Sequence, residues 1–435
     1  MISRPSTLAT LLLATLWMQP ASEAKSLSEL RILYVGSERS TEFIAFLKPQ
    51  FHQVEGRTTE NFNFTNAEPF DVVLLDWPHG EEVHSLTEPA SPLGQRDVWH
   101  KPTVVLGIAG RNLASAWKTK GASGCSCLPS LAYELRDHEI FERPFKIERK
   151  MRRIPTPKEF RGKVHESEIE VLSLVDNSQL PWRPGWCSES DDFALHPDIE
   201  VFCGGINPQS PKAAGLWRQG NLLHFGFEQS PMEMNDQGRQ LLLNSIAYIS
   251  RFTEDRPIAT STAVASDSVL GQVANSRKAL NLWLINNQNN LEEIKDILSP
   301  DLQVKLSRLD RDKIADWLNL NASFLHPDRT RRIALDEDLA TLGVPFDQPE
   351  FFVKSIEGLC AGGGSAERAR RVLERYVPAG PKQGSSNAWA TWWSENKRYA
   401  FTLDSGDAVW YVDALAKKRG IPTKELRGPK RATVF

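Results

Sequence analysis

Short, continuous apolar runs alternate with helix-like segments over the first half of the chain. The runs are RILYVG at 31–36, FDVVLLDW at 70–77 and TVVLGI at 103–108. Between the first two runs, residues 41–51 place apolar side chains at helical spacing. A strand without polar alternation is buried on both faces, which is typical of parallel sheets covered by helices. This pattern predicts an α/β fold of flavodoxin-like type, with a mostly parallel sheet and helices on both faces.

The rest of this half has a different pattern. Residues 168–175 alternate apolar and polar side chains, as a half-buried strand does. Residues 215–228 hold two short apolar runs around a turn, which predicts a β-hairpin. Residues 235–252 carry an apolar stripe at helical spacing, so we expect a long amphipathic helix there.

The composition shifts beyond this helix. Residues 253–276 are rich in Ala, Ser, Thr and Val and hold few large apolar groups, which is typical of a linker. From residue 277 to 435 the apolar spacing is mostly helical. The sequence therefore predicts a signal segment at 1–24, an α/β domain at 28–252, a linker at 253–276 and a smaller, mostly α-helical domain at 277–435.

The helical half contains a dense aromatic stretch, AWATWWSENKRYAF at 388–401. Trp389, Trp392 and Trp393 recur at the spacing of a buried helix face. Hydrophobic core is therefore favoured over an aromatic platform for sugars. A protein partner bound through this half is a further alternative.

The overall composition is that of a globular protein, with 40% hydrophobic and 25% charged residues. The net charge of −3 gives no bulk attraction to nucleic acid or membrane. In the first 24 residues, Arg4 precedes an apolar run, and small residues stand at Ser22 and Ala24. This is the pattern of a secretory signal peptide cleaved after Ala24. We expect an exported protein, periplasmic or extracellular, with no nucleic-acid partner and no membrane attachment after signal removal.

Export makes disulfide bonds available to the cysteines. Four candidates in the first half could form two bridges: Cys125, Cys127, Cys187 and Cys203. Cys360 is left over. Cys125 and Cys127 are expected to bridge distant partners more easily than each other. A zinc site is disfavoured, because Cys-x-Cys without a clear second pair is poor ligand spacing, and the sequence predicts neither a metal nor a cofactor.

A sharp strand-to-helix turn is predicted in KPTVVLGIAGRNLASAW at 101–117. An apolar run ends in Gly107-Ile108-Ala109-Gly110, and a helix-like stretch follows. Enzymes often mount a catalytic nucleophile on such a turn, which is then called an elbow. Here the exposed position of the elbow holds Ala109, which offers no nucleophile.

Several segments within residues 30–252, in this order along the chain, resemble the class I glutamine amidotransferase-like superfamily. They are most similar to its trehalose-utilisation-protein-like (ThuA-like) members. The segments are RILYVG, FDVVLLD, KPTVVLGIAGRNLASAW, DHEIFERPF, GLWRQGNLLHFGFE and LLLNSIAYI. Active amidotransferases carry a cysteine at the elbow, with a histidine and a glutamate after a late strand. The resemblance implies that Ala109 takes the place of the cysteine, so this protein is not expected to be a glutamine amidotransferase.

Open α/β sheets bind ligands beyond the carboxyl ends of their strands. The residues expected there are Ser37, Glu38, Asp76, Trp77, Gly110, Arg111 and Asn112. Arg111, at a helix start, either clamps a carboxylate or phosphate or is a solvated surface residue. Asp76 either contacts the ligand or caps a turn.

His224 and Glu228 could approach the same site from the predicted hairpin, although they lack the adjacent pattern of the family. With Asp76 they are the candidates for acid/base catalysis. The alternative for His224 is a structural position on one face of the hairpin.

Three functions are open. The first is that a degenerate amidotransferase-like domain, lacking the cysteine nucleophile, binds a small polar or carbohydrate ligand. The second is a ThuA-like enzyme that acts on carbohydrate derivatives by acid/base chemistry. The third is a non-catalytic scaffold. Convergence of Asp76, Arg111 and His224 on one site favours the first two, and a strand-end edge filled with apolar side chains favours the third.

Overall fold

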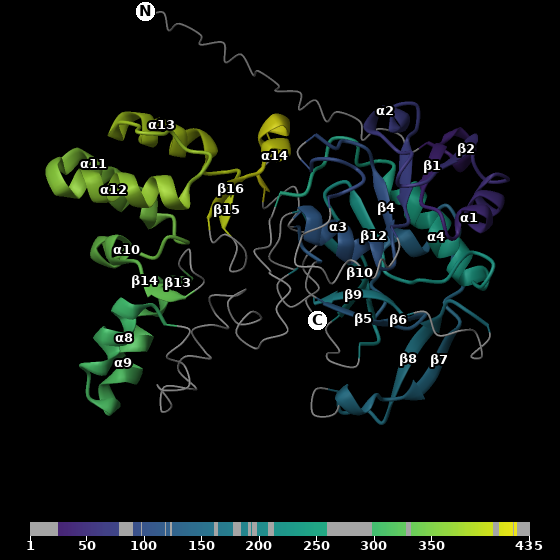
Figure 1. Ribbon diagram of the computed structural model, residues 1–435, viewed down its shortest axis with the longest axis horizontal. Helices are drawn as coiled ribbons and strands as arrows, with labels where there is room; N and C mark the ends of the chain where they lie inside the picture. The colour runs from purple at the N-terminus through teal and green to yellow at the C-terminus, as the bar shows by residue number, and fades with distance from the viewer. Residues whose placement is uncertain are drawn as a thin grey trace, which may run out of the picture.

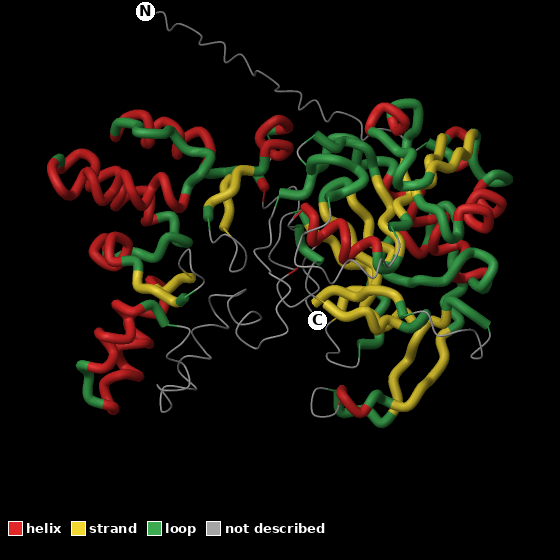
Figure 2. The backbone as a smooth tube through the Cα atoms, in the orientation of Figure 1, coloured by secondary structure: helices red, strands yellow, loops and turns green. Residues whose placement is uncertain are grey.

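The computed structural model is shown in Figure 1 and Figure 2. It describes residues 25–77, 90–96, 98–117, 119–121, 124–160, 164–176, 184–189, 193, 198–207, 213–258, 298–327, 332–402, 409–420 and 422–423. The predicted signal peptide and most of the predicted linker lie outside these residues, so the domain boundaries stay predictions. No helix in the described part of the chain is long and apolar enough to span a membrane.

The sheet has a parallel core that contains the predicted apolar runs. Its strands are β1 (Arg31–Val35), β2 (Gln53–Arg57), β3 (Val72–Leu75), β4 (Thr103–Leu106) and β12 (Leu222–Phe225). They lie in the order β2-β1-β3-β4-β12, and each neighbouring pair is parallel. The carboxyl ends of these strands therefore meet at one edge of the sheet.

Helices cover both faces of the parallel core (Figure 1). They are α1 (Ser40–Leu47), α2 (Phe64–Ala67), α3 (Ala109–Trp117) and α4 (Asp236–Ile249). Successive side chains of β1 enter different cores, because a strand alternates its side chains between two faces. Ile32 and Tyr34 share a core with α1 and α4, whereas Leu33 and Val35 share a core with α2 and α3. The predicted α/β fold class is confirmed.

Beyond β12 the sheet continues with antiparallel pairs, so the whole sheet is mixed. These strands are β5 (Gly124–Leu128), β6 (Leu131–Tyr133), β7 (Met151–Pro155), β8 (Glu168–Ser173), β9 (Gly185–Glu189), β10 (Ile199–Gly205) and β11 (Ala213–Gln219). From β12 the order is β11-β10-β6-β8-β7, and β9 pairs with both β11 and β5. The predicted hairpin is formed by β11 and β12, and Gly220 supplies the positive φ of its turn.

A mostly helical region follows, as predicted. Its helices are α8 (Pro300–Ser307), α9 (Arg311–Asn321), α10 (Glu337–Leu342), α11 (Glu350–Ala361), α12 (Gly363–Tyr376), α13 (Ser386–Asn396) and α14 (Ala414–Arg419). Among the described residues of this region, two small sheets pair β13 (Leu325–Pro327) with β14 (Ile333–Leu335) and β15 (Ala400–Thr402) with β16 (Trp410–Val412). Trp389 of α13 is fully buried, and Trp392 and Trp393 pack against the same core. Trp389 is therefore a core residue, as the spacing indicated, whereas Trp392 and Trp393 are half-buried at the edge of that core.

Candidate functional site

The elbow lies between β4 and α3. Gly107 has a φ of +50°, a backbone conformation that favours glycine. Ala109 begins α3 and is fully buried. The elbow therefore has the predicted strand–turn–helix geometry, but Ala109 was expected at an exposed position and is instead packed in the core beneath α3.

Four polar side chains meet at the carboxyl ends of the parallel strands: Tyr34, Arg39, Asp76 and Glu228. We call them the strand-end cluster. Arg39 follows β1, Asp76 follows β3 and Glu228 follows β12. Arg39 Nε donates to Asp76 Oδ2 at 3.0 Å, and Arg39 Nη2 lies 3.2 Å from Glu228 Oε1. The Tyr34 hydroxyl also donates to Asp76, and Arg39 donates to the Glu228 carbonyl oxygen.

The strand-end cluster is almost closed to water. The side chains of Arg39 and Asp76 are 8% and 7% exposed, and that of Glu228 is 15% exposed. Burial opposes the charge of Arg39, but the hydrogen bond to Asp76 and the charge of Glu228 outweigh it and raise the pKa of Arg39. Burial, followed by the charge of Asp76, raises the pKa of Tyr34, so its hydroxyl stays protonated. The cluster thus holds one cation between two carboxylates.

Glu228 joins this cluster to the elbow. Its Oε2 accepts a hydrogen bond from the Ile108 N–H at 3.0 Å. A Cβ atom built on Gly107 would overlap the Oε2 and Cδ atoms of Glu228. The Glu228 carboxylate therefore accepts a hydrogen bond from a backbone amide of the elbow. Only glycine at position 107 leaves room for this carboxylate.

His224 of β12 packs against the elbow and is shielded from water. It is 2% exposed, and its ring stacks on Trp217 with 3.9 Å between centroids and 2° between planes. A Cβ atom on Gly110 would lie 3.0 Å from His224 Nδ1. Neither ring nitrogen has a hydrogen-bond partner among the described residues. Burial lowers the pKa of His224 to about 3, so the ring is neutral at ordinary pH.

This burial predicts a pH dependence of stability. The pKa of His224 is about 3 in the folded chain against 6.5 for an ordinary histidine. The unfolded chain therefore binds a proton that the folded chain excludes, and stability falls as the pH drops from about 6.5 toward 3. At pH 4 the loss through this residue is about 3 kcal/mol, from about 1.4 kcal/mol per pH unit.

Urea unfolding of the wild type and of His224→Phe at pH 7 and pH 4 measures this loss. We expect the variant, which cannot be protonated, to lose about 3 kcal/mol less between the two pH values. His52→Phe is the matched control, because His52 is exposed to solvent. Equal losses in the wild type and His224→Phe would contradict the buried, neutral state of His224.

The other predicted site residues are spread around the same edge. Arg111, half-buried in the first turn of α3, has its guanidinium 5.5 Å from the ring centroid of Trp186. Asn112 is buried and donates from Nδ2 to the Trp77 carbonyl oxygen at 3.4 Å. Gly110 is buried, whereas Ser37 and Glu38 are exposed.

The structure brings Asp76 and Glu228 together through a residue that the sequence prediction omitted. Arg39 lies in the loop after β1, next to the predicted Ser37 and Glu38. Tyr34 was also omitted. The available signal for Tyr34 was a hydroxyl-bearing side chain near the end of an otherwise apolar run. Arg39 gave no signal in the sequence, because its importance depends on two carboxylates that are distant in the chain.

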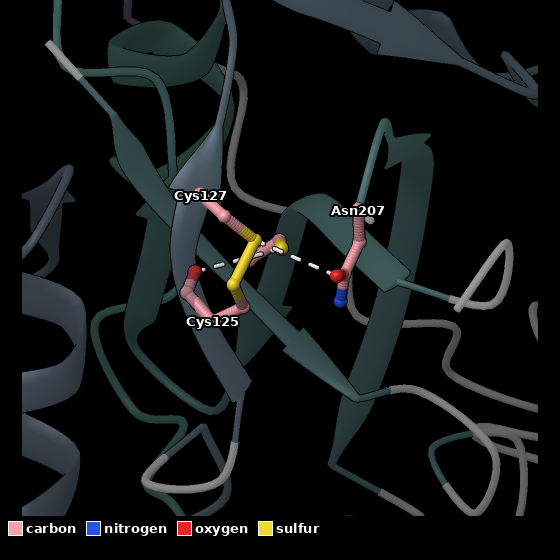
Figure 3. The surroundings of a disulfide bond; sticks show 4 residues. Cys125, Cys127 and Asn207 are labelled. Carbon is pink, nitrogen blue, oxygen red and sulfur yellow. Dashed lines mark hydrogen bonds between the residues drawn. A yellow bond between two sulfur atoms is a disulfide. The ribbon is translucent and has the colours of Figure 1, made fainter. Parts of the chain in front are cut away.

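The prediction that Cys125 and Cys127 bridge distant partners more easily than each other was wrong. Cys125 and Cys127 are bonded to each other, as Figure 3 shows. The two Cα atoms are 5.2 Å apart, within the usual range for a disulfide. β5 has an irregular register against β9 between Cys125 and Leu128, and such a bulge shortens and bends an extended strand. Cys187 and Cys203 are buried thiols, so the structure forms neither of the long-range bridges.

The residues that the structure describes include no group of three His, Cys, Asp or Glu side chains placed to hold a metal ion. The candidate site is built from the elbow, the strand-end cluster and the Arg111–Trp186 contact.

Neither a protein-family model nor a curated protein matches the chain. Solved structures do match about half of it. A GMP synthase subunit from Thermoplasma acidophilum has 10% identity and a TM-score of 0.31, covering 52% of this chain and 97% of its own. A ThuA-like protein from Bacteroides uniformis ATCC 8492 has 15% identity and a TM-score of 0.30, covering 55% and 98%. These are the two kinds of protein that the sequence resembles, and the matches concern the fold alone.

Proposed function

We propose that this protein is exported and binds a small polar ligand, of the sugar or sugar-acid class, at the carboxyl ends of its parallel strands. In this proposal the domain performs no amidotransferase chemistry. The strand ends of an open α/β sheet are the usual place for such a ligand.

The observation that carries the proposal is the strand-end cluster. Buried ion pairs are poor sources of stability, because the cost of removing charges from water offsets their attraction. A scaffold would be served as well by apolar side chains at this edge. A set of buried, paired charges at the ligand-binding edge instead favours a site that recognises polar groups. Arg111 supplies a half-buried guanidinium beside an aromatic ring, a combination that suits a polar ligand with a carboxylate.

An acid/base enzyme is supported less well. A general acid or base works best with a pKa near the working pH. The low pKa of His224 leaves it a poor base, and its ring contacts Trp217 rather than Asp76 or Glu228. Both carboxylates are paired with Arg39. Ala109 at the elbow offers no nucleophile either. These groups therefore favour ligand binding over catalysis as the function.

Thermal unfolding with a panel of sugars, sugar acids and glutamine tests the binding proposal. A ligand at 100 times its Kd stabilises the folded state by about 2.7 kcal/mol, which raises Tm by several degrees. We expect at least one sugar or sugar acid to do so, and Arg111→Ala to remove the shift. Arg152→Ala is the matched control, because Arg152 is exposed on β7. A wild-type protein whose Tm is unmoved by the whole panel contradicts the proposal.

Export is proposed from the pattern of residues 1–24 and is supported by the Cys125–Cys127 disulfide, since disulfides persist in oxidising compartments. Fractionation of producing cells and N-terminal sequencing of the mature protein test it. We expect a mature chain that begins at Lys25. Recovery of the uncleaved chain in the cytoplasm would contradict export.

A further inference from the structure

A third sulfur atom stands beside the disulfide. Cys125 of β5 is directly opposite Cys187 of β9 in the antiparallel register. The Cys187 thiol donates to the Cys125 carbonyl oxygen, with 3.6 Å between sulfur and oxygen. Directly opposed residues have Cβ atoms about 4.5–5.5 Å apart, and a disulfide needs about 3.5–4.5 Å. An approach of about 1 Å therefore brings Cys125 and Cys187 within bonding geometry.

A hydrogen-bond acceptor for the thiol form of Cys127 also lies beside this residue. Cys127 Sγ lies 3.4 Å from Asn207 Oδ1. Figure 3 marks this contact with a dashed line. A disulfide sulfur carries no hydrogen, so it cannot donate to this oxygen. A Cys127 thiol could donate to it, because S–H is a weak donor and an amide oxygen is an acceptor. This contact thus becomes a hydrogen bond only when Cys127 is released from its disulfide.

The three sulfurs differ in their access to solvent. Cys125 and Cys127 are partly buried, whereas Cys187 is fully buried. A small thiol in solution can therefore reach the existing disulfide but not Cys187. Cys203 belongs to the same hydrophobic core but lies on β10 opposite Leu216, so it is not the register partner of either bonded cysteine.

We propose that Cys125, Cys127 and Cys187 form a thiol–disulfide exchange site with two disulfide isomers. The Cys187 thiolate attacks Cys125 Sγ, the Cys125–Cys187 bond forms, and the Cys125–Cys127 bond breaks. Cys127 leaves as a thiolate and takes up the proton that Cys187 lost. The step is an isomerisation, so it consumes no oxidant and no reductant. External thiols of the glutathione class accelerate it by forming a transient mixed disulfide at Cys125, whose displacement by Cys187 releases the thiol again.

The exchange alters a strand that touches the candidate ligand site. β9 carries Trp186 next to Cys187, and the Trp186 ring lies under Arg111. A Cβ atom on Gly185 would overlap the Gly226 carbonyl oxygen and lie 3.1 Å from the Glu228 nitrogen, so β9 packs closely on the segment that leads to Glu228. A covalent bond between β9 and β5 therefore changes the positions of the β9 residues that pack against Arg111 and against the segment leading to Glu228. This effect on binding rests on the proposed function, whereas the exchange does not.

Oxidation of the full-length Cys127→Ser variant with oxidised glutathione tests whether Cys125 and Cys187 can bond. The first thiol forms a mixed disulfide, the second displaces glutathione, and two thiols are oxidised for each glutathione disulfide reduced. After acid quenching, unfolding and alkylation, peptide mapping is expected to show a Cys125–Cys187 bond and the loss of two alkylatable thiols. The bond should persist in Cys127→Ser/Cys203→Ser, the matched control, and disappear in Cys127→Ser/Cys187→Ser. A folded variant that keeps glutathione on Cys125 and a thiol at Cys187 overturns the proposal.

The wild-type chain tests whether the exchange occurs without a mutation. After incubation in a glutathione redox buffer and acid quenching, we expect both isomers, with alkylated Cys127 recovered wherever Cys187 is protected. Recovery of the Cys125–Cys127 isomer alone at every buffer ratio overturns the exchange. Neither measurement involves a sugar, so its failure is distinct from a failure of the proposed ligand binding.

Discussion

Replacement of Arg39 by methionine is expected to lower the free energy of unfolding by about 4 kcal/mol, because removing one partner of a buried ion pair leaves uncompensated charge. Methionine is long enough to fill part of the space but carries no charge. Asp76 and Glu228 would then face each other in a nearly water-free site without their shared cation. Urea unfolding at pH 7 measures the loss.

A matched control lies on the preceding strand. Arg31 Nε is 3.1 Å from Asp71 Oδ2, but the Arg31 side chain is 39% exposed. Arg31→Met should lower the free energy of unfolding by less than Arg39→Met does, because the Arg31 side chain is partly open to water, where an ion pair contributes less. The triple variant Arg39→Met, Asp76→Asn, Glu228→Gln should regain much of the loss, since it removes the unpaired charges as well. Equal effects of Arg31→Met and Arg39→Met would contradict the account of the strand-end cluster.

The parallel core could be predicted from the sequence because a strand that is buried on both faces has a continuous run of apolar residues. Runs such as 70–77 contain no alternation, so they read as strands between layers of helices. The strand-end position of Asp76 followed from the same pattern, whereas Glu228 was expected to approach the site from the predicted hairpin. The antiparallel extension was harder to predict, because its short strands are separated by irregular loops and pair across large sequence distances.

The candidate site depends on such distant contacts. Arg39 contacts Glu228, 189 positions away, and no local pattern marks an arginine as buried. His224 was predictable as a residue on a hairpin face, but its stacking on Trp217 depends on the register of β11 and β12. The Cys125–Cys127 bond depends on a local irregularity of β5, and an ideal extended strand would have given no reason to expect it.

Replacement of Gly107 by alanine is expected to lower the free energy of unfolding by about 3–4 kcal/mol. The positive φ alone costs an L residue about 1–2 kcal/mol. The remaining 2 kcal/mol or so comes from overpacking, because the new Cβ would overlap the Glu228 carboxylate and push it from the Ile108 N–H. Gly94→Ala separates the two effects. Gly94 has a φ of +80°, and a Cβ added there would meet nothing within 4 Å, so this variant should lose only the backbone part.

The overlap with Glu228 can be isolated by a double-mutant cycle. The atoms of Glu228 that meet the new Cβ all belong to its side chain. In a Glu228→Ala background, Gly107→Ala should therefore cost about as much as Gly94→Ala, which gives a coupling energy of about 2 kcal/mol between positions 107 and 228. Urea unfolding of the four proteins of the cycle measures this coupling. A coupling near zero would mean that the carboxylate moves aside freely. The elbow and the strand-end cluster would then be neighbours in space but not one energetically connected site.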